Sequence, residues 1–165
     1  MRSAVKLDIG LLDYGRAHLL QKKIVELKIQ EPDTPDYLIC IEHPPVFTLG
    51  KRGGQENLVV SSKFLEKKQI QVIQTNRGGN ITFHGPGQAV LYPIVNLERH
   101  RIGIKDFVFG LEQVIIDTIG NFGVQSDRDP KNHGVWVQDS KIASIGISVK
   151  HGISFHGIAV NAFMD

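Results

Sequence analysis

The segment between residues 77 and 88, RGGNITFHGPGQ, concentrates residue types that can bind a ligand or take part in a reaction. Glycine has no Cβ, so the backbone N–H groups of Gly78 and Gly79 can approach a ligand closely. Arg77 can offer a planar fork of donors to a carbonyl group or an anion, and His84 can exchange a proton near neutral pH. The same glycines would also suit a tight hairpin. The segment therefore predicts either a ligand-binding loop or a turn that only shapes the backbone.

The sequence gives little support for a nucleotide site or a metal site. No Gly-Lys-Ser/Thr sequence closes the segment, as a P-loop requires, and its glycine spacing differs from the dinucleotide-binding fingerprint. The seven histidines are scattered without an HExxH motif, and the single cysteine rules out paired thiolate ligands. We therefore expect no metal and no cofactor.

A second candidate is Lys141, the first residue of KIASIG at 141–146. Alternation along a strand places it on the same face as Ala143 and Ile145, where small and apolar groups point. A lysine held in an apolar pocket can act as a base or proton donor, because burial disfavours its charged form. A water-exposed lysine at a sheet edge is the other interpretation.

His156 and Cys40 both fit structural roles. His156 lies in the strand-like segment SFHGIAVN at 154–161, which places it on the opposite face from Phe155 and Gly157. A lone histidine in a strand is more often a satisfied structural residue than a catalyst. Cys40 is flanked by isoleucines, where a free cysteine behaves as a small buried hydrophobe, and no nearby residue lowers its pKa.

Short strands interrupted by two long helices must position these residues. One long helix is expected from Asp13, its N-cap, to about Ile29, with an apolar stripe of Leu20, Ile24 and Leu27. The other spans about 103–122, and a short helix is expected near 62–68. Strands are expected at 4–9, 37–41, 46–50, 70–74, 135–138, 141–149 and 153–162. This pattern predicts one α+β domain over 1–165, with a mixed or antiparallel sheet.

The composition, 41% apolar and 22% charged, is that of a globular protein in solution. A net charge of +2 is far from the cationic field of a nucleic-acid binder, so we expect no nucleic-acid partner. No apolar run approaches the roughly 20 residues that span a bilayer, and the first ten residues do not look like a signal peptide. With one cysteine that cannot form an internal disulfide, these features predict a cytoplasmic protein.

Three blocks, in this order along the chain, resemble the lipoyl(octanoyl) transferases, also called lipoate-protein ligase B or octanoyl-carrier-protein:protein octanoyltransferase. They are RGGNITFHGPGQ, KIASIG and SFHGIAVN, and EHPPVFTLG at 42–50 and Leu91-Tyr92-Pro93 fit the same family. The resemblance runs from about residue 10 to the last residue. It implies a mixed sheet flanked by helices, like the catalytic domain of biotin- and lipoate-protein ligases.

The resemblance also implies an activity. A family member transfers an octanoyl group from octanoyl-acyl carrier protein to a lysine of a lipoyl domain, the first step of lipoate assembly. Its acceptors are the lipoyl domains of 2-oxoacid dehydrogenase complexes and the H protein of glycine cleavage. No metal or nucleotide is implied, because the thioester donor is already activated.

The family's site residues carry over onto matching positions of this sequence. Lys141 matches the lysine that works with a catalytic thiol. The stretches that line the acyl pocket match Arg77, Gly78, Gly79, Asn80, Ile81, Thr82, Phe83, His84, Ser144, Ile145, Gly146, Gly157, Ile158 and Ala159. In the family the nucleophilic cysteine lies shortly after an Asn-x-x-Met-Asp segment, and here that segment, 161–165, ends the chain. The chain is then either a truncated form, which we favour, or a form that has lost catalysis. In both cases it lacks the nucleophile, and we expect it to be inactive as it stands.

Two other functions stay open. An ATP-dependent lipoate or biotin ligase on the same fold would need a site for an acyl adenylate. A protein that captures acyl groups or carrier domains without transferring them would need only the pocket.

Overall fold

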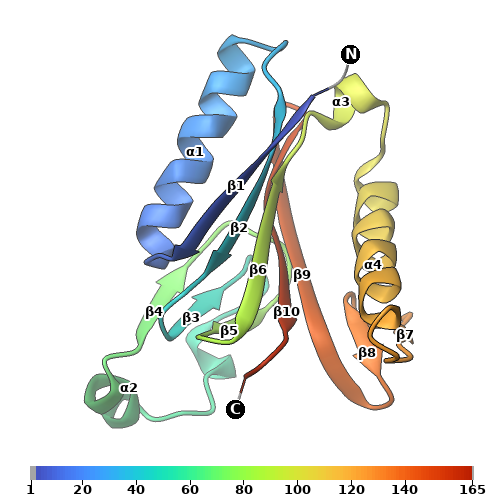
Figure 1. Ribbon diagram of the computed structural model, residues 1–165. Coiled ribbons are helices and arrows are strands. Elements are labelled where there is room, and N and C mark those ends of the chain that lie inside the picture. The colour runs from blue at the N-terminus through green and yellow to red at the C-terminus, as the bar shows by residue number, and fades with distance from the viewer. Residues whose placement is uncertain (1–2, 165) are drawn as a thin grey trace.

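The structure is a computed structural model that describes residues 3–164 (Figure 1). Residues 1, 2 and 165, which include both ends of the predicted domain, lie outside the described part. The elements in chain order are β1 (Ala4–Leu11), α1 (Tyr14–Gln30), β2 (Asp36–Glu42), β3 (Val46–Leu49), η1 (Gln55–Asn57), α2 (Ser62–Lys68), β4 (Gln71–Gln74), β5 (Ile81–His84), β6 (Gln88–Ile94), α3 (Leu97–His100), α4 (Ile104–Gly120), β7 (Asp127–Arg128), β8 (Val135–Val137), β9 (Ser140–Lys150) and β10 (Ile153–Asn161).

The strands form two sheets. The larger is mixed and has the order β1-β2-β6-β10-β9-β8-β7, in which only β1 and β2 run parallel. The smaller has the order β4-β3-β5. Helix α1 lies on one side of the large sheet and α4 on the other (Figure 1). The predicted α+β class with a mixed sheet between helices is confirmed.

Helix α1 begins where the sequence predicts. The Asp13 side chain accepts a hydrogen bond from the Arg16 backbone N–H at 3.1 Å, which satisfies one of the free donors of the first turn. The buried stripe differs from the predicted one: it includes Tyr14, Ala17, Gln21, Ile24 and Lys28. Two of these are polar, and each meets a specific partner from another element. The predicted stripe, which contained apolar residues only, is therefore rotated around the helix axis relative to the stripe that is buried in the structure.

Each long helix packs on its own core. Helix α1 covers apolar residues of β2, β6 and β10, among them Ile39, Val90 and Phe155. Helix α4 places Ile115 against Ala143 of β9 and other residues of β8 and β10. The two faces of the large sheet are thus covered by different helices.

The segment 77–88 forms more structure than the sequence predicted. Its second half contains strand β5 and the start of β6, joined by a turn at Gly85–Gly87. These strands do not pair with each other: β5 pairs with β3 in the small sheet, and β6 pairs with β2 and β10 in the large one. The glycines and proline of the turn therefore carry the chain from one sheet to the other. Helix α3 and strand β7 were also not predicted, because both are too short to show a period.

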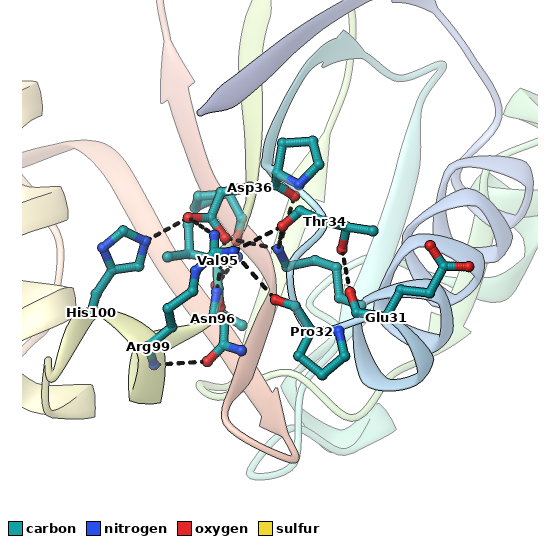
Figure 2. A network of polar contacts seen from close by, with 12 residues as sticks. Glu31, Pro32, Thr34, Asp36, Val95, Asn96, Arg99 and His100 are labelled. Atoms are coloured by element: carbon teal, nitrogen blue, oxygen red, sulfur yellow. Dashed lines mark hydrogen bonds and ion pairs between the residues drawn. The ribbon is translucent and has the colours of Figure 1, made fainter. Parts of the chain in front are cut away.

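A buried polar network joins the first residue of β2 to α1 and α3 (Figure 2). The Asp36 carboxylate pairs with Lys28 Nζ at 2.8 Å and with Arg99 Nη2 at 2.9 Å. It also accepts hydrogen bonds from His100 Nε2 at 2.5 Å and from the Asn96 backbone N–H at 3.1 Å. Asp36 therefore ties the loop after α1 to the start of α3.

Candidate active site

Arg77 is buried and organises the loop that it begins. Its Nε and Nη2 donate hydrogen bonds to Thr48 of β3, the latter to the carbonyl oxygen at 2.6 Å. Its Nη1 donates to Gly78 O at 2.9 Å and its Nη2 to Asn80 O at 3.1 Å. The fork of donors that the sequence offered to a ligand is thus directed at the protein's own carbonyl groups, because a buried guanidinium needs partners for its N–H groups.

Three glycine segments meet beside this loop. The Gly78 backbone N–H donates to Ile147 O of β9 at 2.9 Å. A Cβ at Gly146 would lie 2.9 Å from Gly78 O, and one at Gly50 would lie 2.5 Å from Gly79 O. Such distances are too short for real Cβ atoms, so Gly50 and Gly146 allow the end of β3, the 77–79 loop and β9 to pack backbone to backbone.

A small buried cavity of about 20 Å³ lies where these segments meet β6 and β10. Its lining comes from six elements or loops, from α1 to β10. The lining residues are Tyr14, Arg77, Thr82, His84, Val90, Tyr92, Ser144, Gly146, His156, Gly157, Ile158 and Ala159. Eight of the residues matched to the acyl pocket therefore contribute to one cavity.

The other matched residues lie around this cavity without lining it. Ile81 and Phe83 alternate along β5 with Thr82 and His84, so their side chains take the other face. Ile145 packs on the α4 side of the sheet. Gly78, Gly79 and Asn80 contribute backbone contacts to the Arg77 loop.

Four lining residues were not among the sequence candidates: Tyr14, Val90, Tyr92 and His156. Tyr92 belongs to the Leu-Tyr-Pro sequence that fits the family, and this was the available signal for it. Tyr14 had no local signal, because its position depends on how α1 packs across the sheet.

In two histidines near the cavity, hydrogen bonds determine which ring nitrogen carries the proton. His43 Nδ1 donates to Leu12 O at 2.7 Å, which leaves Nε2 to accept a hydrogen bond from the Tyr92 hydroxyl at 2.7 Å. His84 Nδ1 donates to Gln88 Oε1 at 2.7 Å. Burial lowers the pKa of His43, and burial lowers the pKa of His84 to about 4 despite the bond to Gln88. Both rings are therefore neutral at physiological pH.

Lys141 does not line the cavity. It shares its strand face with Ala143, which packs under α4, whereas Ser144 and Gly146 of the alternate positions line the cavity. Its Nζ donates to His133 O at 2.8 Å and lies 5.0 Å from the centre of the Trp136 ring. Burial lowers the pKa of Lys141, and the negative charges of nearby carboxylates oppose this effect.

Cys40 is half-buried in β2, where Asp8 of β1 and Leu91 of β6 are its register partners. Its neighbours Ile39 and Ile41 belong to the core under α1, so Cys40 takes the opposite face of the sheet and does not line the cavity. Burial raises the pKa of its thiol.

A larger hollow of about 1,300 Å³ lies between the end of α4 and the β7–β8 region, with Arg128, Trp136 and Asp139 among its lining residues. It contains none of the matched pocket residues. Within residues 3–164, no three His, Cys, Asp or Glu side chains gather as a metal site would require. No helix of this part of the chain is long and apolar enough to cross a membrane.

The fold is similar to that of solved lipoate-protein ligases. A putative lipoate protein ligase of T. acidophilum with bound lipoic acid has a TM-score of 0.78 at 13% identity, over 100% of this chain and 70% of that one. A lipoate-protein ligase A bound with ATP has a TM-score of 0.75 at 12% identity, over 100% of this chain and 68% of that one. At such identities the likeness shows the fold alone.

Sequence comparisons identify the family to which the chain belongs. The profile of the lipoyl protein ligase A/B catalytic domain matches residues 13–165, and the chain belongs to this family. The octanoyltransferase of Syntrophobacter fumaroxidans is 44% identical over 161 residues, which are 98% of this chain and 70% of that protein. The octanoyltransferase of Maridesulfovibrio salexigens is 45% identical over 159 residues, which are 96% of this chain and 74% of that protein.

Proposed function

We propose that this chain is an octanoyltransferase of lipoate biosynthesis and that the cavity beside the Arg77 loop binds the acyl group. The observation that carries the proposal is the convergence of residues 77–84, 144–146 and 157–159 around one cavity. The relatives that are 44% and 45% identical to this chain are octanoyltransferases.

The cavity suits the reactive end of an acyl group better than a whole octanoyl chain. A volume of about 20 Å³ holds about one water molecule, so the chain binds only if side chains of the apolar wall, such as Val90 and Ile158, move apart. Burying seven apolar carbons at about 0.8 kcal/mol each would contribute about 5–6 kcal/mol. This gain exceeds the usual free energy of a few side-chain rearrangements.

The transfer requires a thiolate, a group that manages its proton and donors for the tetrahedral oxyanion. We propose Lys141 as the proton partner, because it matches the lysine that works with the catalytic thiol in the lipoyl(octanoyl) transferases, and burial lowers the pKa of its amine. Cys40 is not our candidate for the nucleophile, since it lies in an apolar strand before all three motif blocks and burial raises the pKa of its thiol. The thiolate would attack the donor thioester carbon and release the carrier thiol, and the acceptor amine would then release the enzyme thiol.

For the partners we propose octanoyl-acyl carrier protein as donor, in the cytoplasm. The acceptors would be lysines of the lipoyl domains of 2-oxoacid dehydrogenase complexes and of the glycine cleavage H protein. These are the partners that the resemblance to the lipoyl(octanoyl) transferases implies.

Acyl binding is tested by titrating the 165-residue chain with octanoate and with butyrate in a calorimeter. The four additional carbons should strengthen binding by roughly two orders of magnitude if the chain is buried. Equal affinities for the two acids would contradict an acyl pocket.

The nucleophile is tested by incubating the same chain with octanoyl-acyl carrier protein and recording its intact mass. We expect no hydroxylamine-sensitive adduct of one octanoyl group, because the only thiol of these 165 residues is Cys40. An adduct that disappears in Cys40→Ser would instead make Cys40 the nucleophile.

An ATP-dependent ligase is the second candidate, because a lipoate-protein ligase A bound with ATP shares the fold at a TM-score of 0.75. Exchange of pyrophosphate into ATP in the presence of octanoate or lipoate distinguishes the two activities. Exchange would support the ligase, and its absence together with octanoate binding would support the transferase. Octanoate binding without octanoyl transfer by the natural full-length gene product would instead indicate a non-catalytic acyl-binding protein.

A further inference from the structure

His156 has a strained backbone in the middle of strand β10. Its φ is 57°, in the left-handed region, where a residue other than glycine costs on the order of 1–3 kcal/mol. Four other non-glycine residues of the described chain have positive φ, and all lie at helix ends or in turns: Gln69, Arg101, Gln138 and His151. Among the non-glycine residues of 3–164, only His156 combines this conformation with a place inside a strand. Such residues are concentrated at functional sites.

The left-handed backbone changes the direction of the His156 side chain. The sequence predicted His156 and Phe155 on opposite faces, as in any extended strand. Instead Phe155 packs in the core under α1, and the ring of His156 also contacts α1, where it stacks on His18 at 5.0 Å. The positive φ breaks the alternation and turns both side chains to the same side of the sheet.

The neighbouring strand accommodates this break. The pairing of β10 with β6 runs from Ile158–Leu91 to Asn161–Gln88 and stops short of His156, and Pro93, two residues beyond Leu91 along β6, has no N–H to donate. The carbonyl oxygen of Pro93 accepts instead from Ser154 Oγ at 2.7 Å. The His156 backbone N–H donates to the buried Gln21 Oε1 of α1 at 2.7 Å. Specific side chains therefore supply partners for the His156 N–H and for the Pro93 carbonyl oxygen beyond the end of the pairing with β6.

The imidazole of His156 connects three parts of the cavity wall. Its Nε2 donates to Asn76 Oδ1 at 2.9 Å, one residue before Arg77. Its Nδ1 then accepts from the Tyr14 hydroxyl at 3.4 Å. The ring is 1% exposed. One side chain thus joins α1, the 76–79 loop and β10, and the next residue, Gly157, lies so close to Leu91 O that a side chain cannot be placed there.

We propose that His156 is the positioning residue of the acyl pocket: its strained backbone and its ring hold Tyr14, Asn76 and the edge at Gly157 in the arrangement that receives the acyl group. The inference rests on the proposed function, because it assigns the strain to a pocket that binds acyl chains. Preorganisation by such a residue increases affinity, since the bound arrangement no longer has to be selected from several.

The test compares octanoate affinity and melting temperature for His156→Asn and for His151→Gly in the 165-residue chain. Asparagine tolerates the left-handed region but can replace only one of the two hydrogen bonds of the ring. We expect His156→Asn to weaken octanoate binding tenfold or more while the protein still melts cooperatively. His151 is the matched control, a histidine with φ 46° in the exposed β9–β10 turn, and its glycine variant should bind within twofold of wild type.

A double-mutant cycle with Tyr14→Phe shows whether His156 acts through its partner. If it does, the two changes together weaken binding little more than His156→Asn alone, whereas independent residues would give additive losses. A role confined to stability would lower the melting temperature and leave the affinity of the folded protein unchanged. Wild-type affinity in a folded His156→Asn variant, or additivity in the cycle, overturns the proposal.

Two further outcomes are decisive. If His156→Asn does not fold, Tyr14→Phe and Asn76→Ala leave residue 156 intact, and wild-type affinity in both variants would overturn the proposal. If the wild-type protein binds no octanoate, the proposed function fails and the inference fails with it. That outcome differs from one in which wild type and variants bind equally well, which contradicts the role of His156 alone.

Discussion

At the scale of single residues, the buried guanidinium of Arg77 explains the shape of the 77–80 loop. Its hydrogen bonds reach carbonyl oxygens of Thr48, Gly78 and Asn80. A lysine at this position could not make these bonds together, because it presents a point charge in place of a planar fork. Arg77, which the sequence suggested as a direct contact to a ligand, therefore shapes the proposed acyl site through the backbone that it holds in place.

The prediction at the scale of single residues concerns Lys141. In a form of the protein that transfers octanoyl groups, Lys141→Ala should reduce the transfer rate by several powers of ten, because the nucleophilic thiol loses its proton partner. Lys141→Arg should restore little, since a guanidinium stays protonated. The measurement is single-turnover transfer from octanoyl-acyl carrier protein.

The control for Lys141 is Lys150, on the same strand, whose Nζ pairs with Glu26 at the surface. Lys150→Ala and Lys150→Arg should leave transfer unchanged. Near-normal transfer by Lys141→Arg would show that positive charge alone is needed, and the role in proton exchange would be withdrawn.

At the scale of elements, the site depends on close contact between backbones. The end of β3, the 77–79 loop and β9 approach one another at glycines, and a Cβ at Gly50 or Gly146 would lie within 3 Å of a carbonyl oxygen of the loop. Helices could not make this contact, because their side chains keep neighbouring backbones about 8–10 Å apart. The small sheet β4-β3-β5 therefore docks its loop directly on the large sheet.

Gly146→Ala tests this contact. The new Cβ would lie 2.9 Å from Gly78 O, so the loop must shift, and we expect the free energy of unfolding to fall by about 1–3 kcal/mol. Octanoate affinity should fall as well, because Gly146 lines the cavity. Denaturant titration and calorimetry give the two quantities.

Gly110→Ala is the matched control. Gly110 lies in α4, and a Cβ there would meet no atom within 4 Å. This variant should raise the free energy of unfolding by about 0.5–1 kcal/mol, because alanine is the better helix former, and leave binding unchanged. Equal stability of Gly146→Ala and wild type would show that the loop adjusts freely, against the close-contact interpretation.

At the scale of the whole molecule, the Asp36 network fastens the N-terminal half of the chain to α3 at the end of the sheet. Burial by itself would raise the pKa of Asp36, but hydrogen bonds from Lys28, His100 and Asn96 outweigh it and lower the pKa to about 2. A carboxyl whose pKa is lower in the folded state stabilises the fold above its unfolded pKa of about 3.9. This stabilisation is lost as the pH falls from about 4 to about 2.

This prediction is tested by measuring the free energy of unfolding as a function of pH. Wild type should lose about 2 kcal/mol through Asp36 between pH 5 and pH 2, and Asp36→Asn should lose that much less over the same range. Asp33→Asn, exposed in the same loop, should follow wild type. Parallel curves for wild type and Asp36→Asn would show that Asp36 does not titrate with unfolding.

Much of the secondary structure was determined by local sequence. The predicted helices at 13–29, 62–68 and 103–122 correspond to α1, α2 and α4, and the predicted strands of the last third correspond to β8, β9 and β10. Long periodic segments and an N-cap such as Asp13 carry their own signal, because the relevant contacts are between near neighbours in the chain. The motif blocks likewise identified the family, since they are contiguous in sequence.

Only the tertiary structure decided which of these elements meet and which way their side chains point. The order β1-β2-β6-β10-β9-β8-β7 depends on pairings between strands tens of residues apart, as for Ile158 with Leu91. The buried stripe of α1 includes Gln21, and His156 breaks the alternation of its strand, because each receives a partner from a distant element. Local periodicity does not contain such partners, and a buried polar group takes its direction from the hydrogen bond it must make.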